Sequence, residues 1–174
     1  MKVETTPLEG VLLITPPTMF SDHRGAYVEL YNKETYAAAG IDQEFVEDDI
    51  SVSAGNVLRG VHGDMRTCKL VSCLEGTFYL VVVNFDESSP QYRQWTSFTL
   101  SEENRLQVLI PAKFGNGHAA LSERAIFHYK QSNAYDRASQ FTIRWDDPAI
   151  GMEWPLSAPI LSDRDRDVGN IDGD

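Results

Sequence analysis

The sequence has few cysteines, few histidines and no apolar run long enough to cross a membrane. Cys68 and Cys73, the only cysteines, are an odd number of residues apart on one expected strand, so they should point to opposite faces and stay reduced and buried. The apolar run at residues 11–14 is too short for a signal peptide or a membrane span. The sequence therefore predicts a cytoplasmic protein with no membrane partner.

Basic residues are also scarce. The chain has 15 lysines and arginines against 26 aspartates and glutamates, which gives a net charge of -11. Nucleic acid is excluded as a partner because binding a polyphosphate requires a large basic surface. A small anionic ligand remains compatible if a few basic side chains converge in one pocket. The length of 174 residues and the 42% hydrophobic content are typical of one globular domain, residues 1–174.

Short apolar segments separated by turn residues predict a mostly β protein. One short helix is expected at residues 32–39, where Asn32 can cap the start and Gly40 can end it. Little helix and many short strands favour an antiparallel sandwich or barrel. After about residue 167 the chain is expected to be a frayed tail. Strands are expected at 8–14, 26–31, 45–53, 77–85, 95–100, 106–110, 117–121, 125–130 and 141–145, with a polar connection at 20–25. The nearly continuous apolar run at 77–85 predicts a strand buried on both faces.

Residues 57–86, VLRGVHGDMRTCKLVSCLEGTFYLVVVNFD, contain the pair of residues most typical of catalysis. His62 and Lys69 lie in two apolar segments on either side of a polar turn, which predicts two antiparallel strands and a short distance between the two side chains. Histidine can act as a base at neutral pH, and a lysine ammonium can stabilise a negative oxygen. Taken alone, each residue also fits a structural role in a sheet.

Several ordered motifs strengthen the catalytic interpretation. RGVHGDMRTCKLVSCLEG, FHYK, WDDPAIGMEWP and LSDRD occur in this order between residues 10 and 165. The sequence resembles the nucleotide-sugar 3,5-epimerase family. The resemblance implies an all-β, cupin-type double-stranded jelly roll with one or two short peripheral helices, and a homodimer. It also implies epimerisation, without cofactor or metal, at C3, C5 or both of a nucleoside-diphosphate 4-keto sugar for surface polysaccharide synthesis.

The resemblance assigns roles to four residues of this chain. His62 matches the catalytic base, and Asp165 matches the carboxylate that orients it. Tyr129 matches the acid that delivers a proton to the opposite face of the sugar, and Lys69 matches the cation beside the C4 oxygen. Inversion requires groups on opposite faces, so a histidine and tyrosine pair is chemically suitable.

Further residues match positions where the family contacts its substrate. Simple alternation would place Arg59 and His62 on opposite faces of a strand, so a bulge at Gly60 is required for both to reach one pocket. Phe114 or Tyr135 is expected to stack on the nucleotide base. The expected substrate-binding residues either match positions of the family or lie where this chain departs from the family pattern. They are Arg24, Glu29, Glu47, Asp49, Arg59, Asn116, His118, Gln140 and Arg164.

The departures lie around the expected pocket. The HGD turn after the histidine and the FGNGH segment resemble epimerases that act on GDP-linked 4-keto heptoses. We therefore expect the same proton chemistry on a GDP-linked heptose or hexose, with dTDP-4-keto-6-deoxyglucose as the other candidate.

Three alternatives remain at this level. A metal-dependent cupin would need clustered ligands, whereas the four histidines are scattered. A non-enzymatic sugar-binding module would not require the set of His62, Lys69, Tyr129 and Asp165. A 3,4-ketoisomerase would share the fold and differ in its product.

Overall fold

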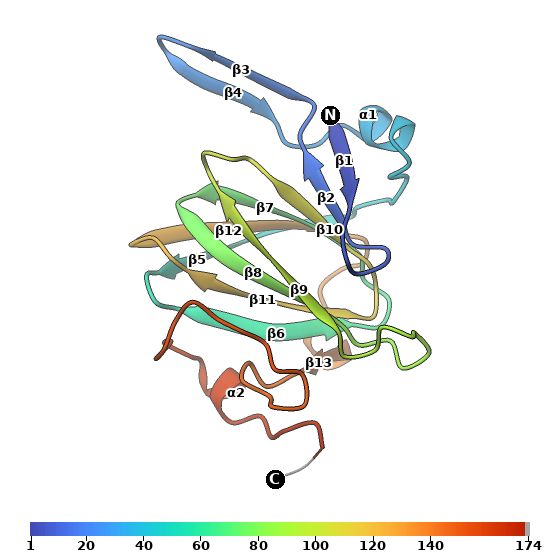
Figure 1. Ribbon diagram of the computed structural model, residues 1–174. Helices are drawn as coiled ribbons and strands as arrows, with labels where there is room; N and C mark the ends of the chain where they lie inside the picture. Colours follow the sequence, from blue (N-terminus) through green and yellow to red (C-terminus); the bar gives the residue numbers. More distant parts are fainter. Residues whose placement is uncertain (173–174) are drawn as a thin grey trace.

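The computed structural model describes residues 1–172. Within these residues, two antiparallel sheets face each other, with only two short α-helices beside them (Figure 1). The six-stranded sheet has the order β1 (Lys2–Thr5), β2 (Leu12–Thr15), β10 (Gln107–Ile110), β7 (Lys69–Glu75), β12 (Arg124–Gln131) and β5 (Glu47–Ala54). The five-stranded sheet has the order β13 (Gln140–Thr142), β6 (Leu58–Asp64), β11 (Phe114–Ala120), β8 (Thr77–Asn84) and β9 (Trp95–Ser101). The predicted all-β jelly-roll class is confirmed.

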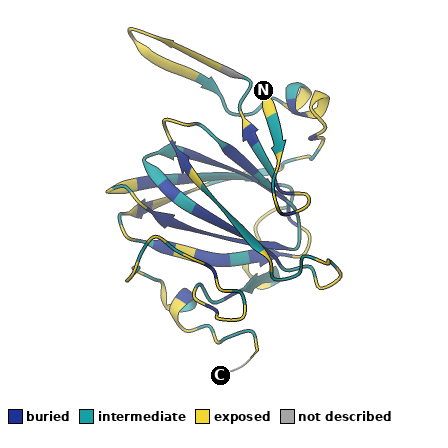
Figure 2. Cartoon of the chain, in the orientation of Figure 1, coloured by how far each residue is buried: buried dark blue, intermediate teal, exposed yellow. Residues whose placement is uncertain are grey.

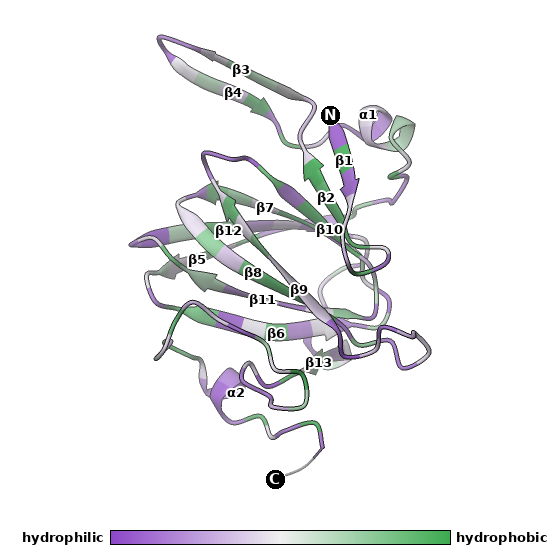
Figure 3. Cartoon of the chain, viewed as in Figure 1, coloured by the Kyte–Doolittle hydropathy of each residue, from purple (hydrophilic) through white to green (hydrophobic). Residues whose placement is uncertain are grey.

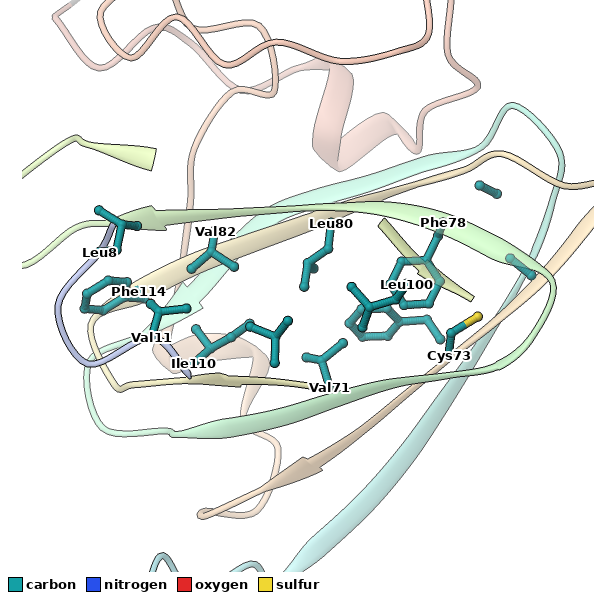
Figure 4. Close-up of a cluster of buried hydrophobic side chains, with 14 residues drawn as sticks. Leu8, Val11, Val71, Cys73, Phe78, Leu80, Val82, Leu100, Ile110 and Phe114 are labelled. Atoms are coloured by element: carbon teal, nitrogen blue, oxygen red, sulfur yellow. The ribbon is translucent and has the colours of Figure 1, made fainter. Parts of the chain in front are cut away.

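The main core lies between the two sheets (Figure 4). Phe78, Leu80 and Val82 alternate along β8 and point from the five-stranded sheet toward Val71 and Ile110 of the six-stranded sheet. These side chains are almost fully buried. Buried residues are concentrated in the strands of the two facing sheets (Figure 2). Burying a side chain of this kind contributes about 1.5–3 kcal/mol, so this layer fixes how the two sheets sit relative to each other.

The five-stranded sheet is also covered on its outer face. Val81 and Val83, which alternate with the core residues of β8, pack against Ile143 and Met152 of the C-terminal segment. The prediction that the strand at 77–85 is buried on both faces is therefore confirmed. Both cysteines are free and buried, as expected.

The predicted helix is present as α1 (Lys33–Ala38). The Asn32 side chain accepts a hydrogen bond from the Thr35 amide at 3.1 Å, and Gly40 follows with a φ of 85°. Tyr36 is fully buried and packs with Ile14 and other apolar residues of the six-stranded sheet. The helix thus covers one end of that sheet's outer face.

Three expectations about the strands were wrong. β6 and β7 do not pair with each other but lie in different sheets, because the connection between them crosses the sandwich. The strand expected at 8–14 begins only at Leu12, and Leu8 lies in a buried loop; β1 at residues 2–5 was missed. The connection expected at 20–25 is largely a hairpin of β3 (Thr18–Asp22) and β4 (Gly25–Glu29), which projects from the body (Figure 1).

The C-terminal segment carries more structure than the loop-like sequence indicates. It follows the short 3-10 helix η1 (Arg137–Ser139) and strand β13, and it contains α2 (Asp163–Arg166), a strongly hydrophilic turn of helix next to β6 (Figure 3). In the stretch after residue 167, the amide of Ile171 donates to Asp147 and Asp172 pairs with Arg93. No helix within residues 1–172 is long and apolar enough to cross a membrane.

Candidate active site

A pocket of about 250 Å³ opens between strands of the two sheets. His62 and Asn116 reach it from β6 and β11 of the five-stranded sheet, whereas Lys69 and Tyr129 reach it from β7 and β12 of the six-stranded sheet. The predicted site residues that line it are Arg59, His62, Lys69, Asn116, His118, Tyr129, Gln140, Arg164 and Asp165. The histidine and the tyrosine thus come from facing sheets and line one cavity.

His62 is held by a buried carboxylate. Its Nε2 lies 2.6 Å from Oδ1 of Asp165, which is 3% exposed, while the His62 side chain is 23% exposed. Burial raises the pKa of Asp165, but the interaction with His62 and the hydrogen bonds at Ser162 and the Gly60 amide together leave that pKa below its usual value. A carboxylate on Nε2 favours the tautomer with the proton there, which leaves the Nδ1 lone pair as the proton acceptor.

The position of Asp165 follows from local backbone structure. Ser162 caps α2 and accepts a hydrogen bond from the Asp165 amide at 3.2 Å, which places the carboxylate in the first turn of the helix. The Gly60 amide donates to its other oxygen at 3.4 Å. The dyad therefore joins strand β6 to a helix about one hundred residues later in the chain.

The expected irregularity at Gly60 is present. Arg59 is opposite His118 and His62 is opposite Asn116, so three steps along β6 match two steps along β11. Gly60 has a φ of 118°, and a Cβ there would lie 2.5 Å from the backbone of Gly117, so only glycine fits. This bulge brings both Arg59 and His62 to the pocket, as the sequence analysis required.

Lys69 is a buried cation at the start of β7. It is 7% exposed, and its Nζ donates to Asn116 Oδ1 at 3.0 Å. Burial lowers the pKa of Lys69 to about 8, against an opposing effect of the Asp64 charge. The side chain is therefore charged at neutral pH and loses its proton a little above it. Its Nζ also lies 5.8 Å from the centre of the Tyr129 ring.

Tyr129 carries a protonated phenol. Burial, followed by the charges of Asp49, Tyr135 and Glu47, raises the pKa of Tyr129 to about 12. The phenol can therefore donate a proton at any physiological pH, and the nearby Lys69 ammonium can stabilise the phenolate that results.

Two arginines line the pocket of this acidic protein. Arg59 donates to Ser53 Oγ at 2.9 Å and to the Val52 carbonyl at 3.1 Å. Arg164 donates to Thr142 Oγ1 at 2.7 Å and to Gln140 Oε1 at 3.2 Å. Their guanidinium groups are held by neutral partners, so their charge is available to an anionic ligand.

Four predicted residues do not line this pocket. Arg24 lies on the projecting hairpin, paired with Asp22 at 2.6 Å, and Glu29 ends the same hairpin. Glu47 and Asp49 both accept hydrogen bonds from the side-chain amide of Gln131. Asp49 is opposite Tyr129 in the strand register, and burial and the neighbouring Glu47 raise the pKa of Asp49.

The structure also adds residues that the sequence analysis did not select. Phe127 is two positions before Tyr129 on the same face of β12, and Ser51 is its partner on β5. Strand alternation contained the signal for Phe127. Ser162 lines the pocket through the α2 cap. Of the two rim aromatics considered, Phe114 is a core residue at 8% exposure, whereas Tyr135 lines the pocket at 49% exposure.

Within residues 1–172, no three histidine, cysteine, aspartate or glutamate side chains lie close enough together to hold a metal ion.

Comparisons with known proteins extend over nearly the whole chain. The family model described as dTDP-4-dehydrorhamnose 3,5-epimerase matches residues 5–172. The dTDP-4-dehydrorhamnose 3,5-epimerase of Salmonella typhimurium is 43% identical over 166 residues, covering 92% of this chain and 91% of that protein. A dTDP-4-dehydrorhamnose 3-epimerase of Streptomyces niveus is 32% identical over 172 residues, which cover 97% of this chain and 83% of that protein.

A solved structure shows the same similarity in three dimensions. The dTDP-6-deoxy-D-glucose-3,5-epimerase of Legionella pneumophila, in complex with dTDP-4-keto-L-rhamnose, matches with a TM-score of 0.90 and 35% identity. The match covers 95% of this chain and 89% of that chain.

Proposed function

Because the chain belongs to the dTDP-4-dehydrorhamnose 3,5-epimerase family and is a carbohydrate epimerase, we propose that it inverts C3, C5 or both of a nucleoside-diphosphate 4-keto sugar without a cofactor. The observation that supports this most directly is the dyad of His62 and Asp165 on one sheet, with Tyr129 on the facing sheet of the same pocket. Inversion requires a base and an acid that reach opposite faces of one carbon.

The proton steps follow from this arrangement. Nδ1 of His62 removes the proton from the carbon next to the C4 carbonyl, and the electron pair moves onto the C4 oxygen to form an enolate. The Lys69 ammonium stabilises this oxygen. Tyr129 then protonates the same carbon from the other face, and its phenolate regains a proton from solvent while His62 releases one. The carbons C3 and C5 both flank the carbonyl, so the same groups serve each of them.

The diphosphate is assigned to the arginines of the pocket. Arg59 and Arg164 present planar guanidinium groups that match phosphate oxygens, and Gln140 accepts a hydrogen bond from Arg164. Tyr135 at the rim offers an aromatic face to the nucleotide base.

The identity of the substrate's nucleotide, dTDP or GDP, is a separate part of the proposal. The named relatives act on dTDP sugars, and their similarity supports dTDP-4-keto-6-deoxyglucose as a substrate. The GDP-linked heptose or hexose expected from the HGD turn and the FGNGH segment has no support among these relatives and stays a prediction.

The test is incubation of the purified protein with dTDP- and GDP-linked 4-keto sugars in deuterium oxide, followed by NMR. We expect deuterium at C3, C5 or both, with an inverted product for the preferred nucleotide. Efficient exchange into the dTDP sugar, with none into GDP sugars, would remove the GDP prediction. A 3,4-ketoisomerase would move the carbonyl instead, and a binding module would leave every sugar unlabelled.

The pKa of Lys69 predicts an alkaline limit to the activity. Since this pKa is lowered to about 8, the ammonium is present below pH 8 and is lost above it. The exchange rate should therefore fall as pH rises through about 8, approaching tenfold per pH unit. A rate profile by NMR from pH 6 to 10 measures this. Lys69→Met should be slow and should lack the limit near pH 8; a wild-type rate that holds up to pH 10 would contradict the role of Lys69.

We also propose that the chain forms a homodimer. β5 is an edge strand, and its outer face exposes Ile50 at 60% and Val52 at 45%. The projecting hairpin exposes Phe20 at 68%. We assign a second copy of the chain to these apolar surfaces, with Arg24 reaching the diphosphate in the second copy's pocket.

This dimer predicts the effect of one charged substitution. Ile50→Asp should convert the dimer to a monomer because a carboxylate on the apolar face would be buried without a partner. Light scattering coupled to gel filtration measures the change, and Glu87→Asp, at an exposed loop position, is the control. A monomeric wild type, or a dimer unaffected by Ile50→Asp, would contradict this interface.

A further inference from the structure

His118 is a pocket residue with an unsatisfied nitrogen. It lies in the middle of β11 at 4% exposure and lines the same pocket as His62 and Tyr129. Its Nε2 is buried and has no hydrogen-bond partner among residues 1–172. Most buried polar groups in native proteins are hydrogen-bonded, and leaving one unpaired is destabilising. His118 lines the pocket, so a group bound there lies against this ring.

The His118 ring is fixed in place by aromatic contacts. It stacks on Phe127 with a centroid distance of 4.1 Å and an interplanar angle of 6°, and it contacts Phe78 at 5.4 Å. Burial, and then the charges of Arg59 and His62, lower the pKa of His118 to about 3. The imidazole is therefore neutral at working pH, with one nitrogen that donates and one that accepts a hydrogen bond.

The chemistry of the surrounding groups indicates which kind of ligand group His118 can bind. Arg59, Arg164 and Lys69 supply the positive charge that phosphate and enolate oxygens require. A neutral imidazole buried among aromatic rings is suited instead to an uncharged polar group, and a sugar offers hydroxyls.

The strand register places His118 within reach of the sugar ring. Asn116, two residues earlier on the same face of β11, is bonded to Lys69 and so marks the expected position of the C4 oxygen. Two residues along a strand correspond to about 7 Å, comparable to the span of a pyranose with its substituents. His118 therefore lies where a ring substituent away from C4 would sit.

From these observations we infer that His118 hydrogen-bonds one hydroxyl of the sugar and thereby determines which 4-keto sugars the enzyme accepts. The inference rests on the proposed function and adds to it the substituent that this chain recognises. His118 is a specificity residue here, and it takes no part in the proton transfer.

The experiment combines one substitution with a set of substrates. His118→Phe keeps an aromatic ring against Phe127 and removes both nitrogens. The substrates are dTDP-4-keto-6-deoxyglucose, its 2-deoxy and 3-deoxy analogues, and the matching sugar with a C6 hydroxyl, with deuterium exchange at C5 as the common readout. We expect His118→Phe to lower kcat/KM about 10- to 100-fold for sugars that carry the recognised hydroxyl. Wild type and variant should be equal for the sugar that lacks it.

His118→Gln serves as the second variant, because its amide can donate and accept and should recover part of the loss. The same reduction for every sugar, or no reduction for any, would overturn the inference while leaving the epimerase proposal intact. Absence of exchange by the wild-type enzyme on all these dTDP sugars and on their GDP-linked counterparts would refute the proposed function instead. Thermal unfolding of each variant checks that the fold is retained.

Discussion

Replacing His62 with alanine should abolish deuterium exchange at both C3 and C5. The dyad with Asp165 makes Nδ1 of His62 the proton acceptor in the pocket, and the same base serves both carbons beside the carbonyl. We expect a loss on the order of 10³-fold in the exchange rate, the range found when a general base is removed. NMR in deuterium oxide measures both positions in one spectrum.

The control for this variant is His128→Gln. His128 lies on β12 but on the outer face of the sheet, where its Nε2 is 2.9 Å from Asp48, so its removal should leave exchange close to the wild-type rate. Asp165→Asn should fall between the two, because it leaves the base but removes the charge that orients it. If His62→Ala still exchanged deuterium at a near-normal rate, His62 would not be the base.

Replacing Tyr129 with phenylalanine should separate exchange from inversion. His62 can still remove and return a proton on its own face, so deuterium exchange should fall less than about tenfold. Inversion requires a proton from the other face, which the facing sheet would no longer supply, so product formation should fall about 10²-fold. Exchange and product are measured in the same NMR time course.

Tyr79→Phe is the matched control for Tyr129→Phe. Tyr79 lies on the five-stranded sheet and packs against Trp154 on the outer side, away from the pocket. Its loss of a hydroxyl should leave both rates unchanged. An equal loss of exchange and inversion in Tyr129→Phe would show that the phenol acts in binding or enolate formation and does not deliver the proton.

The sequence contained the features that depend on local chemistry. The Asn32 cap, the two-face burial of β8 and the bulge at Gly60 were all predicted correctly. Each depends on a few adjacent residues: a capping side chain, an apolar run, and a glycine between two polar residues that must share a face. Asp165 was placed beside His62 only through the family resemblance, because more than one hundred residues separate them.

The errors concern long-range arrangement. The segment between His62 and Lys69 reads as a hairpin turn, and local pattern cannot distinguish a turn within one sheet from a crossing between two sheets. The acidic pair Glu47 and Asp49 was expected to bind substrate; the two residues do not line the pocket, and both accept hydrogen bonds from Gln131 on the neighbouring strand. Such partners become visible only once strand order and register are known.

Because the base belongs to one sheet and the acid to the other, the space in which the reacting carbon must fit between them depends on the separation of the two sheets. That separation is maintained by residues such as Leu80 and Val71, which serve as spacers without touching substrate. Facing sheets pack about 10 Å apart, and a core at native density does not compress freely. The stereochemical outcome therefore depends partly on the core side chains that set the separation of the sheets. Substitutions that change the size of these side chains would change the geometry of catalysis as well.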